Sequence, residues 1–259
     1  MKKLLMSDYD QTLYTTINDL RLNIEAIKRF QNHNFKFAIV TGRSYERIKE
    51  EIDKYNIPYD YLSCVDGSML YDNTDKLLKS YLLNENICNE LKEKIDSQID
   101  IEMTILKEEN INNKNNIIEC YYDVTKYDKI ELLVNIVKKE ILNYQNLKMK
   151  FIDFGIDKLL IITKKDITKR NAGIDIATIE NISHDNIFSI GDHYNDLEML
   201  ESFNGYAMKN SEEILKTVSL GLYDNVSQLI DDIISNKVYT KKRGWKYVCR
   251  WSRNKSRSW

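Results

Sequence analysis

Apolar and polar positions alternate along the first part of the chain with two different periods. Short apolar runs at residues 3–7, 35–40 and 61–65 predict three strands, and apolar positions spaced three or four apart predict helices over 18–32 and 44–55. This succession of strand and helix is typical of a parallel sheet with helices packed on it. Ligands collect at the carboxyl ends of such strands, so the residues that follow each run are the first candidates for a site.

The pattern changes after residue 82 and returns after residue 163. In between, the sequence predicts a helix at 84–97, strands at 100–107 and 116–124, a helix at 128–144, and strands at 147–153 and 158–163. A helix and two strands, repeated once, suggest a separate α+β unit with an antiparallel sheet. The following segment predicts a helix at 169–180, a strand at 187–190, a helix at 195–202, short strands at 206–208 and 221–223 with a helix between them, and a last helix at 226–234.

These elements predict an α/β protein with an inserted unit. We expect residues 1–82 and 164–236 to form a Rossmann-like core, a parallel sheet with helices on both faces. Residues 83–163 should form an α+β cap of the order αββαββ. The 259 residues are enough for both units to bury a core of their own.

Charge separates a third segment from the rest. Residues 237–259 hold nine lysines and arginines, no acid and all three tryptophans, which leaves the first 236 residues with a formal charge of −11 out of the total of −2. Basic, tryptophan-bearing sequence can bind nucleic acid or an anionic membrane. We favour the simpler interpretation, a flexible tail unrelated to the chemistry, because basic runs are usually solvated.

Composition excludes several classes of protein. No apolar run approaches the length of about 20 residues that a membrane-spanning helix needs, and the first residues do not form a secretory signal. The four cysteines show neither a disulfide framework nor the paired spacing of a zinc site. We therefore expect a cytoplasmic protein, a monomer or weak dimer, that acts on a small molecule and binds neither membrane nor, tail aside, nucleic acid.

The strongest chemical signal is the run from Asp8 to Thr12, which follows the first predicted strand. Phosphoryl transfer needs a nucleophile, a cation to offset the phosphate charge and a proton donor for the leaving group. Asp8 and Asp10, two residues apart at a strand end, can converge on one site, where one binds a hard cation and attacks and the other holds a proton. By itself the motif could also be an acidic, solvated loop.

Three further segments lie at strand or helix ends. Thr41, Gly42 and Arg43 follow the second predicted strand, where a hydroxyl and backbone amides at a helix start can cradle a phosphate. Lys169 opens a helix and could neutralise a phosphoryl oxygen. The last segment, Gly191 to Asp196, offers Asp192 as an oxygen ligand and Asn195 and Asp196 as caps or as groups that orient metal-bound water.

In this order and spacing the four segments resemble the haloacid-dehalogenase superfamily, in particular its Cof-type branch with a class IIB cap. The resemblance covers residues 3 to 235, and the insert falls where that branch carries its cap. It implies a phosphohydrolase that uses Mg²⁺ and a phospho-aspartyl intermediate to remove phosphate from a small metabolite such as a sugar phosphate.

The resemblance also implies a role for each residue. Asp8 is the nucleophile, Asp10 the general acid and base, and Thr41 and Lys169 hold the phosphoryl oxygens. The metal-binding set is Asp8, Asp10 (through its carbonyl), Asp192 and Asp196. The substrate-binding set is Thr41, Gly42, Arg43, Asp66, Gly67, Lys169 and Asn195.

The sequence departs from the family at three positions. Gln11 and Arg170 stand where many members have glycine, and Asp66 stands where an Asn-Gly turn is typical, which adds a negative charge beside the phosphate site. None of the three removes a catalytic group. Two alternatives stay open, a phosphomutase or phosphotransferase on the same scaffold and a non-catalytic phosphoacceptor signalling domain.

Overall fold

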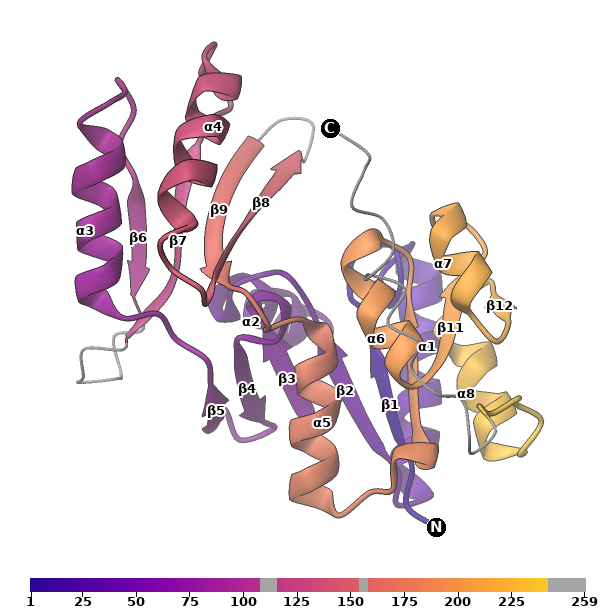
Figure 1. The fold of residues 1–259 in the computed structure, drawn as a ribbon. Coiled ribbons are helices and arrows are strands. Elements are labelled where there is room, and N and C mark those ends of the chain that lie inside the picture. The colour runs from indigo at the N-terminus through magenta and orange to yellow at the C-terminus, as the bar shows by residue number, and fades with distance from the viewer. Residues whose placement is uncertain (108–115, 154–157, 242–259) are drawn as a thin grey trace.

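The computed structural model describes residues 1–107, 116–153 and 158–241 (Figure 1). Within them an eight-stranded sheet has the order β12-β11-β10-β1-β2-β3-β4-β5. Its strands are β1 (Leu4–Ser7), β2 (Lys36–Val40), β3 (Tyr61–Cys64), β4 (Met69–Asp72), β5 (Leu77–Ser80), β10 (Ile187–Gly191), β11 (Asn204–Met208) and β12 (Leu222–Tyr223). The first six in this order are parallel, whereas β4 and β5 add an antiparallel edge.

Helices cover both faces of this sheet, as the sequence predicts. They are α1 (Ile17–Asn32), α2 (Tyr45–Tyr55), α5 (Lys169–Glu180), α6 (Leu197–Ser202), α7 (Glu213–Val218) and α8 (Val226–Ile234). Alternate residues of β1 face opposite sides: Leu5 packs with α1, α2 and α8, whereas Leu4 and Met6 pack with α5, α6 and α7. The α/β class is thus confirmed, but the sheet is mixed, because the hairpin of β4 and β5 was not predicted.

Several predicted elements differ in extent by a few residues. The strand expected at 100–107 is β6 (Thr104–Lys107), since residues 97–103 form a turn and a loop after α3. The helix expected at 195–202 begins as a 3₁₀ turn, η3 (Tyr194–Asp196), before α6. These differences lie at element ends, where local sequence patterns are least informative.

A second sheet of four antiparallel strands, in the order β6-β7-β9-β8, lies beyond the carboxyl ends of the parallel strands (Figure 1). Its elements are α3 (Glu85–Asp96), β6, β7 (Ile117–Asp123), α4 (Ile130–Ile141), β8 (Leu147–Asp153) and β9 (Lys158–Lys164). Helices α3 and α4 cover one face of this sheet with a separate apolar core. The other face is directed at the larger sheet, and we call this second unit the cap.

The tail prediction concerns mainly residues 242–259, which lie outside the described residues. The described residues 237–241 contact the larger unit. The Tyr206 hydroxyl donates to the Tyr239 carbonyl, and the Lys241 ammonium donates to the carbonyls of Leu200 (2.9 Å) and Glu201 (2.7 Å). In the described part of the chain, no helix is long and apolar enough to cross a membrane.

Candidate active site

The first parallel strand delivers Asp8 into a buried position at the centre of the sheet. Strand β1 lies between β10 and β2, so the residues that follow these three strands meet at one edge. Asp8 is 5% exposed, and its backbone amide donates to the Ile190 carbonyl at 3.0 Å. The structure therefore places Asp8, after β1, and Asp192, after β10, at the strand ends where the sequence predicts them.

Lys169 occupies the space between two of the acids. Its ammonium donates to Asp8 Oδ1 at 2.6 Å and to Asp196 Oδ1 at 2.8 Å, and the side chain is 1% exposed. Burial alone would lower the pKa of Lys169, but the carboxylates of Asp196 and Asp8 outweigh it and raise that pKa. The ammonium is therefore a fixed positive charge beside Asp8.

Asp196 has both carboxylate oxygens engaged. Oδ1 accepts from Lys169, and Oδ2 accepts from the backbone amides of Asp192 (3.0 Å) and His193 (3.2 Å). This arrangement fixes the loop between β10 and η3 and the position of Lys169 at the same time. Asp196 therefore fits an orienting role better than that of a direct metal ligand.

Asp8 and Asp192 form the open part of the cluster. Carboxylate oxygens of Asp8, Asp192 and Asp196 lie within 4.8 Å of one another. Burial, followed by the neighbouring carboxylates, raises the pKa of Asp8 well above its usual range although Lys169 opposes this, and burial likewise raises the pKa of Asp192. The hydroxyl of Thr12 donates to Asp192 Oδ1 at 2.6 Å.

Thr41 and Asp66 lie on neighbouring backbone. Thr41 follows β2 and is buried, its amide donates to the Ser63 carbonyl at 2.9 Å, and its carbonyl accepts from the amide of Asp66 at 3.0 Å. Asp66 lies in the 3₁₀ turn η1 (Val65–Gly67) with a left-handed backbone, φ 51°. A Cβ at Gly67, where φ is 95°, would come within 2.3 Å of the Thr168 carbonyl, so only glycine lets this turn approach the start of α5.

The side chain of Asp10 lies outside the carboxylate cluster. Its two oxygens accept from Arg43, Oδ2 from Nε at 2.9 Å and Oδ1 from Nη2 at 2.6 Å. The Arg43 guanidinium lies 5.1 Å from the centre of the Tyr9 ring, and the Arg43 amide donates to the Thr41 hydroxyl at 3.1 Å. Gly42 lies between Thr41 and Arg43, and a Cβ at this position would come within 3.1 Å of Asp66 Oδ1.

Comparison with known proteins decides the family. A sequence profile described as haloacid dehalogenase-like hydrolase matches residues 5–154 and 99–228. The chain belongs to this family. The resemblance predicted from the four segments is thereby confirmed, and the protein is a hydrolase of the haloacid-dehalogenase superfamily.

Relatives extend over nearly the whole of this hydrolase. A proposed phosphatase of Buchnera aphidicola subsp. Baizongia pistaciae is 30% identical over 268 residues, which cover 93% of this chain and all of the relative. A haloacid dehalogenase-like hydrolase from Bacteroides thetaiotaomicron has the same fold, with a TM-score of 0.71, 16% identity, and coverage of 90% of this chain and 100% of that one. A subclass IIB sugar phosphatase aligns with a TM-score of 0.67, 16% identity, and coverage of 89% and 98%.

The donor set of this hydrolase fits a magnesium ion. Carboxylate oxygens of Asp8 and Asp192 lie within 4.8 Å of each other, and a cation between them would offset the repulsion of two such close anions. Carboxylate oxygens are ligands that Mg²⁺ prefers, and Asp8 and Asp192 each have an oxygen that Lys169 and Thr12 do not engage. These two residues would hold the ion, and Asp196 would orient Lys169 and the loop that carries Asp192.

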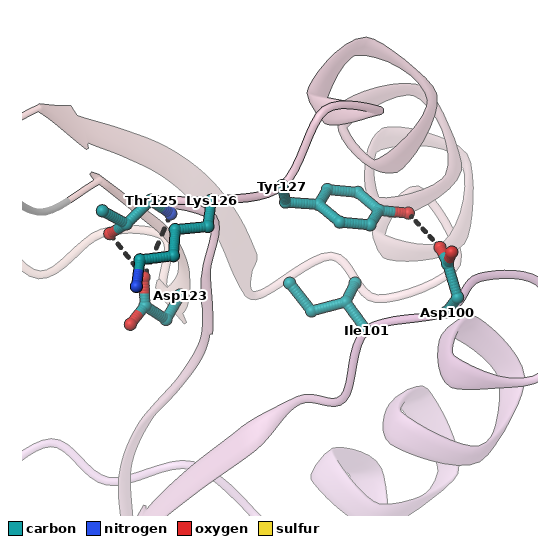
Figure 2. A pocket seen from close by; sticks show the side chains of 6 residues that line it. All are labelled: Asp100, Ile101, Asp123, Thr125, Lys126 and Tyr127. Atoms are coloured by element: carbon teal, nitrogen blue, oxygen red, sulfur yellow. Dashed lines mark hydrogen bonds between the residues drawn. The ribbon is translucent and has the colours of Figure 1, made fainter.

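The pocket in Figure 2 lies elsewhere. It is in the cap and is lined by Asp100, Ile101, Asp123, Thr125, Lys126 and Tyr127, none of which the sequence singles out. Two of its hydrogen bonds join lining residues, since Tyr127 donates to Asp100 at 3.0 Å and Thr125 donates to Asp123 at 2.6 Å. The carboxylate cluster, and not this pocket, is the candidate active site.

Two contributors to the site were missed from the sequence. Thr12 was read only as part of a motif, and the structure gives it a hydrogen bond to Asp192. Lys150, in the cap, donates to Asp66 Oδ2 at 2.7 Å. The place of Thr12 in the motif of residues 8–12 could have indicated it, whereas no local pattern distinguishes Lys150 from other lysines of the cap.

Lys169 should be a major source of stability in metal-free protein. Lys169→Gln leaves two buried carboxylates without their counter-charge, and we expect the free energy of unfolding to fall by about 3 kcal/mol. Chemical denaturation in the presence of a chelator measures this. The matched control is Lys209→Gln, which removes an exposed ion pair with Asp224 and should cost less than about 1 kcal/mol. Equal losses in the two variants would contradict the buried triad.

Proposed function

We propose that this hydrolase is a Mg²⁺-dependent phosphatase that removes phosphate from a small phosphorylated metabolite through a phosphorylated Asp8. The observation that carries the proposal is the buried carboxylate of Asp8 with the Lys169 ammonium 2.6 Å away. A carboxylate can approach a phosphate only if positive charge offsets their repulsion. Lys169 supplies one such charge, and a magnesium ion held by Asp8 and Asp192 would supply the other.

The proposed reaction has two steps. An oxygen of Asp8 attacks phosphorus, the bond from phosphorus to the ester oxygen breaks, and Asp10 gives that oxygen a proton. Asp10 then takes a proton from water, which attacks the phosphorus of the acyl phosphate and releases inorganic phosphate and the Asp8 carboxylate. Thr41, Gly42 and Arg43 lie in the segment between β2 and α2, where they would bind the phosphoryl oxygens together with Lys169.

The substrate should enter between the cap and the carboxylate cluster. Asp66 and Gly67 belong to the turn η1, which the cap meets through Lys150, and Asn195 Nδ2 donates to Asp66 Oδ1 at 3.1 Å. We propose that this turn contacts the part of the substrate that leaves. Closure of the cap over it would exclude bulk water while Asp8 attacks the ester, before a single water hydrolyses the acyl phosphate.

Phosphate release should depend on Mg²⁺. Purified protein tested against a panel of phosphorylated metabolites should release inorganic phosphate with Mg²⁺ and lose at least about 99% of this activity in excess chelator. Calcium should inhibit, because it takes more oxygen ligands at looser geometry and would engage both oxygens of Asp8. Full activity in chelator would remove the metal from the account, and activity only with an added acceptor would favour a phosphotransferase.

A further inference from the structure

One lysine of the cap reaches into the candidate active site. Lys150, on β8, donates to Asp66 Oδ2 at 2.7 Å, and the two side chains are only 23% and 18% exposed. The face of the cap sheet that carries Lys150 is the one opposite α3 and α4. A second lysine on this face, Lys148, donates to the Ile167 carbonyl at 2.9 Å. Both lysines connect β8 to the larger unit, but only Lys150 does so through a charge pair.

Asp66 lies at the meeting point of three segments of the site. Its amide donates to the Thr41 carbonyl, its Oδ1 accepts from Asn195, and Lys169 is close enough to interact with its charge. Burial opposes ionisation, but Lys150 and then Lys169 lower the pKa of Asp66 to about 2. Asp66 is therefore an anion at neutral pH, placed beside the position that we assign to the phosphate.

Such an anion is unfavourable for a phosphatase unless it is neutralised. An incoming phosphate ester is itself negative, and in a partly buried site like charges repel strongly. Lys150 supplies the missing positive charge. Its other acidic neighbour, Glu119 on β7, has its pKa raised by burial and by Asp66, so Asp66 is the stronger partner.

We propose that Lys150 is a positioning residue of the reaction: it cancels the charge of Asp66 and holds the cap sheet over Asp8, so that a phosphate ester can bind. The inference rests on the proposed function. It adds that the reaction needs a charged residue of the cap, Lys150. The pair is complete only when cap and core are in contact, so neutralisation of the phosphate site is coupled to closure.

Kinetics of single and double variants with 4-nitrophenyl phosphate and Mg²⁺ test the charge pair. Lys150→Gln should raise KM about tenfold or more, because Asp66 is then uncompensated, and should change kcat less than about threefold, because the reacting groups are intact. Lys150→Arg should keep KM near the wild-type value. In Asp66→Asn/Lys150→Gln the KM should return to within about threefold of wild type.

The control and a second measurement separate this inference from the proposed function. Lys129→Gln removes a lysine whose ion pair with Asp100 lies within the cap, and KM should not change. Hydrogen exchange of the amides in β8 and in η1 needs no turnover and should accelerate in Lys150→Gln but not in Lys150→Arg or Lys129→Gln. An inactive wild-type protein would reject the proposed function. A KM in the double variant as high as in Lys150→Gln, or unchanged exchange in Lys150→Gln, would overturn the role of Lys150.

Discussion

Replacing Asp8 with asparagine should reduce phosphate release by at least about four orders of magnitude, because a carboxamide cannot form an acyl phosphate. The fold should persist, since an asparagine can still accept the hydrogen bond from Lys169 through its side-chain oxygen. Initial rates with an aryl phosphate, together with circular dichroism, measure both. Asp224→Asn, which changes an exposed acid paired with Lys209, serves as the matched control and should be fully active.

A near-normal rate in Asp8→Asn would show that Asp8 is not the nucleophile. The burial of Asp8 makes the test informative. Its carboxylate is held by Lys169 inside a cluster in which carboxylates of Asp192 and Asp196 lie within 4.8 Å, and any of the three could in principle attack. Asp196 has both oxygens engaged, and Asp192 accepts from Thr12, which leaves Asp8 as the residue at the end of the central strand.

Replacing Asp10 with alanine should reduce kcat about 10³-fold for alkyl phosphates and much less for aryl phosphates. A basic leaving oxygen needs a proton as its bond to phosphorus breaks, whereas a good leaving group departs without one. In the structure both oxygens of Asp10 face Arg43, so its side chain must turn from the guanidinium toward the ester oxygen. Equal losses with both classes of ester would show that Asp10 serves only to hold Arg43.

Much of the fold could be predicted because the local pattern and the tertiary position agree. Leu4, Leu5 and Met6 are fully buried in β1, and such a continuous apolar run is what a central parallel strand requires. An acid directly after that run must then lie at the carboxyl edge of the sheet. The same reasoning placed Asp192 after β10, and the structure brings carboxylate oxygens of the two residues within 4.8 Å of each other.

The hairpin of β4 and β5 could not be predicted in the same way. Its strands are four residues each, interrupted by polar residues, and they are held by pairing with β3 rather than by their own pattern. The pairing of Lys150 with Asp66 joins residues 84 positions apart in different units. Such contacts depend on how the cap docks, which a reading of local sequence does not contain.

The orientation of the Asp10 side chain could not be predicted from the sequence either. A motif gives the spacing of two carboxylates, but the direction of an exposed side chain depends on its neighbours in space. Here Arg43, from the segment after β2, binds Asp10 in a bidentate pair. The family resemblance implies a substrate-binding role for Arg43, and this contact adds that any such role requires Arg43 to release Asp10.

Trapping the phosphorylated enzyme tests the central claim most directly. Wild-type protein is mixed with Mg²⁺ and the best ester of the metabolite panel, stopped with acid within one turnover, digested and examined by mass spectrometry. We expect one added phosphoryl group on the peptide that contains Asp8, removed by hydroxylamine as an acyl phosphate should be, and absent from Asp8→Asn. Turnover without any such adduct, or an adduct on a peptide that lacks Asp8, would contradict the account.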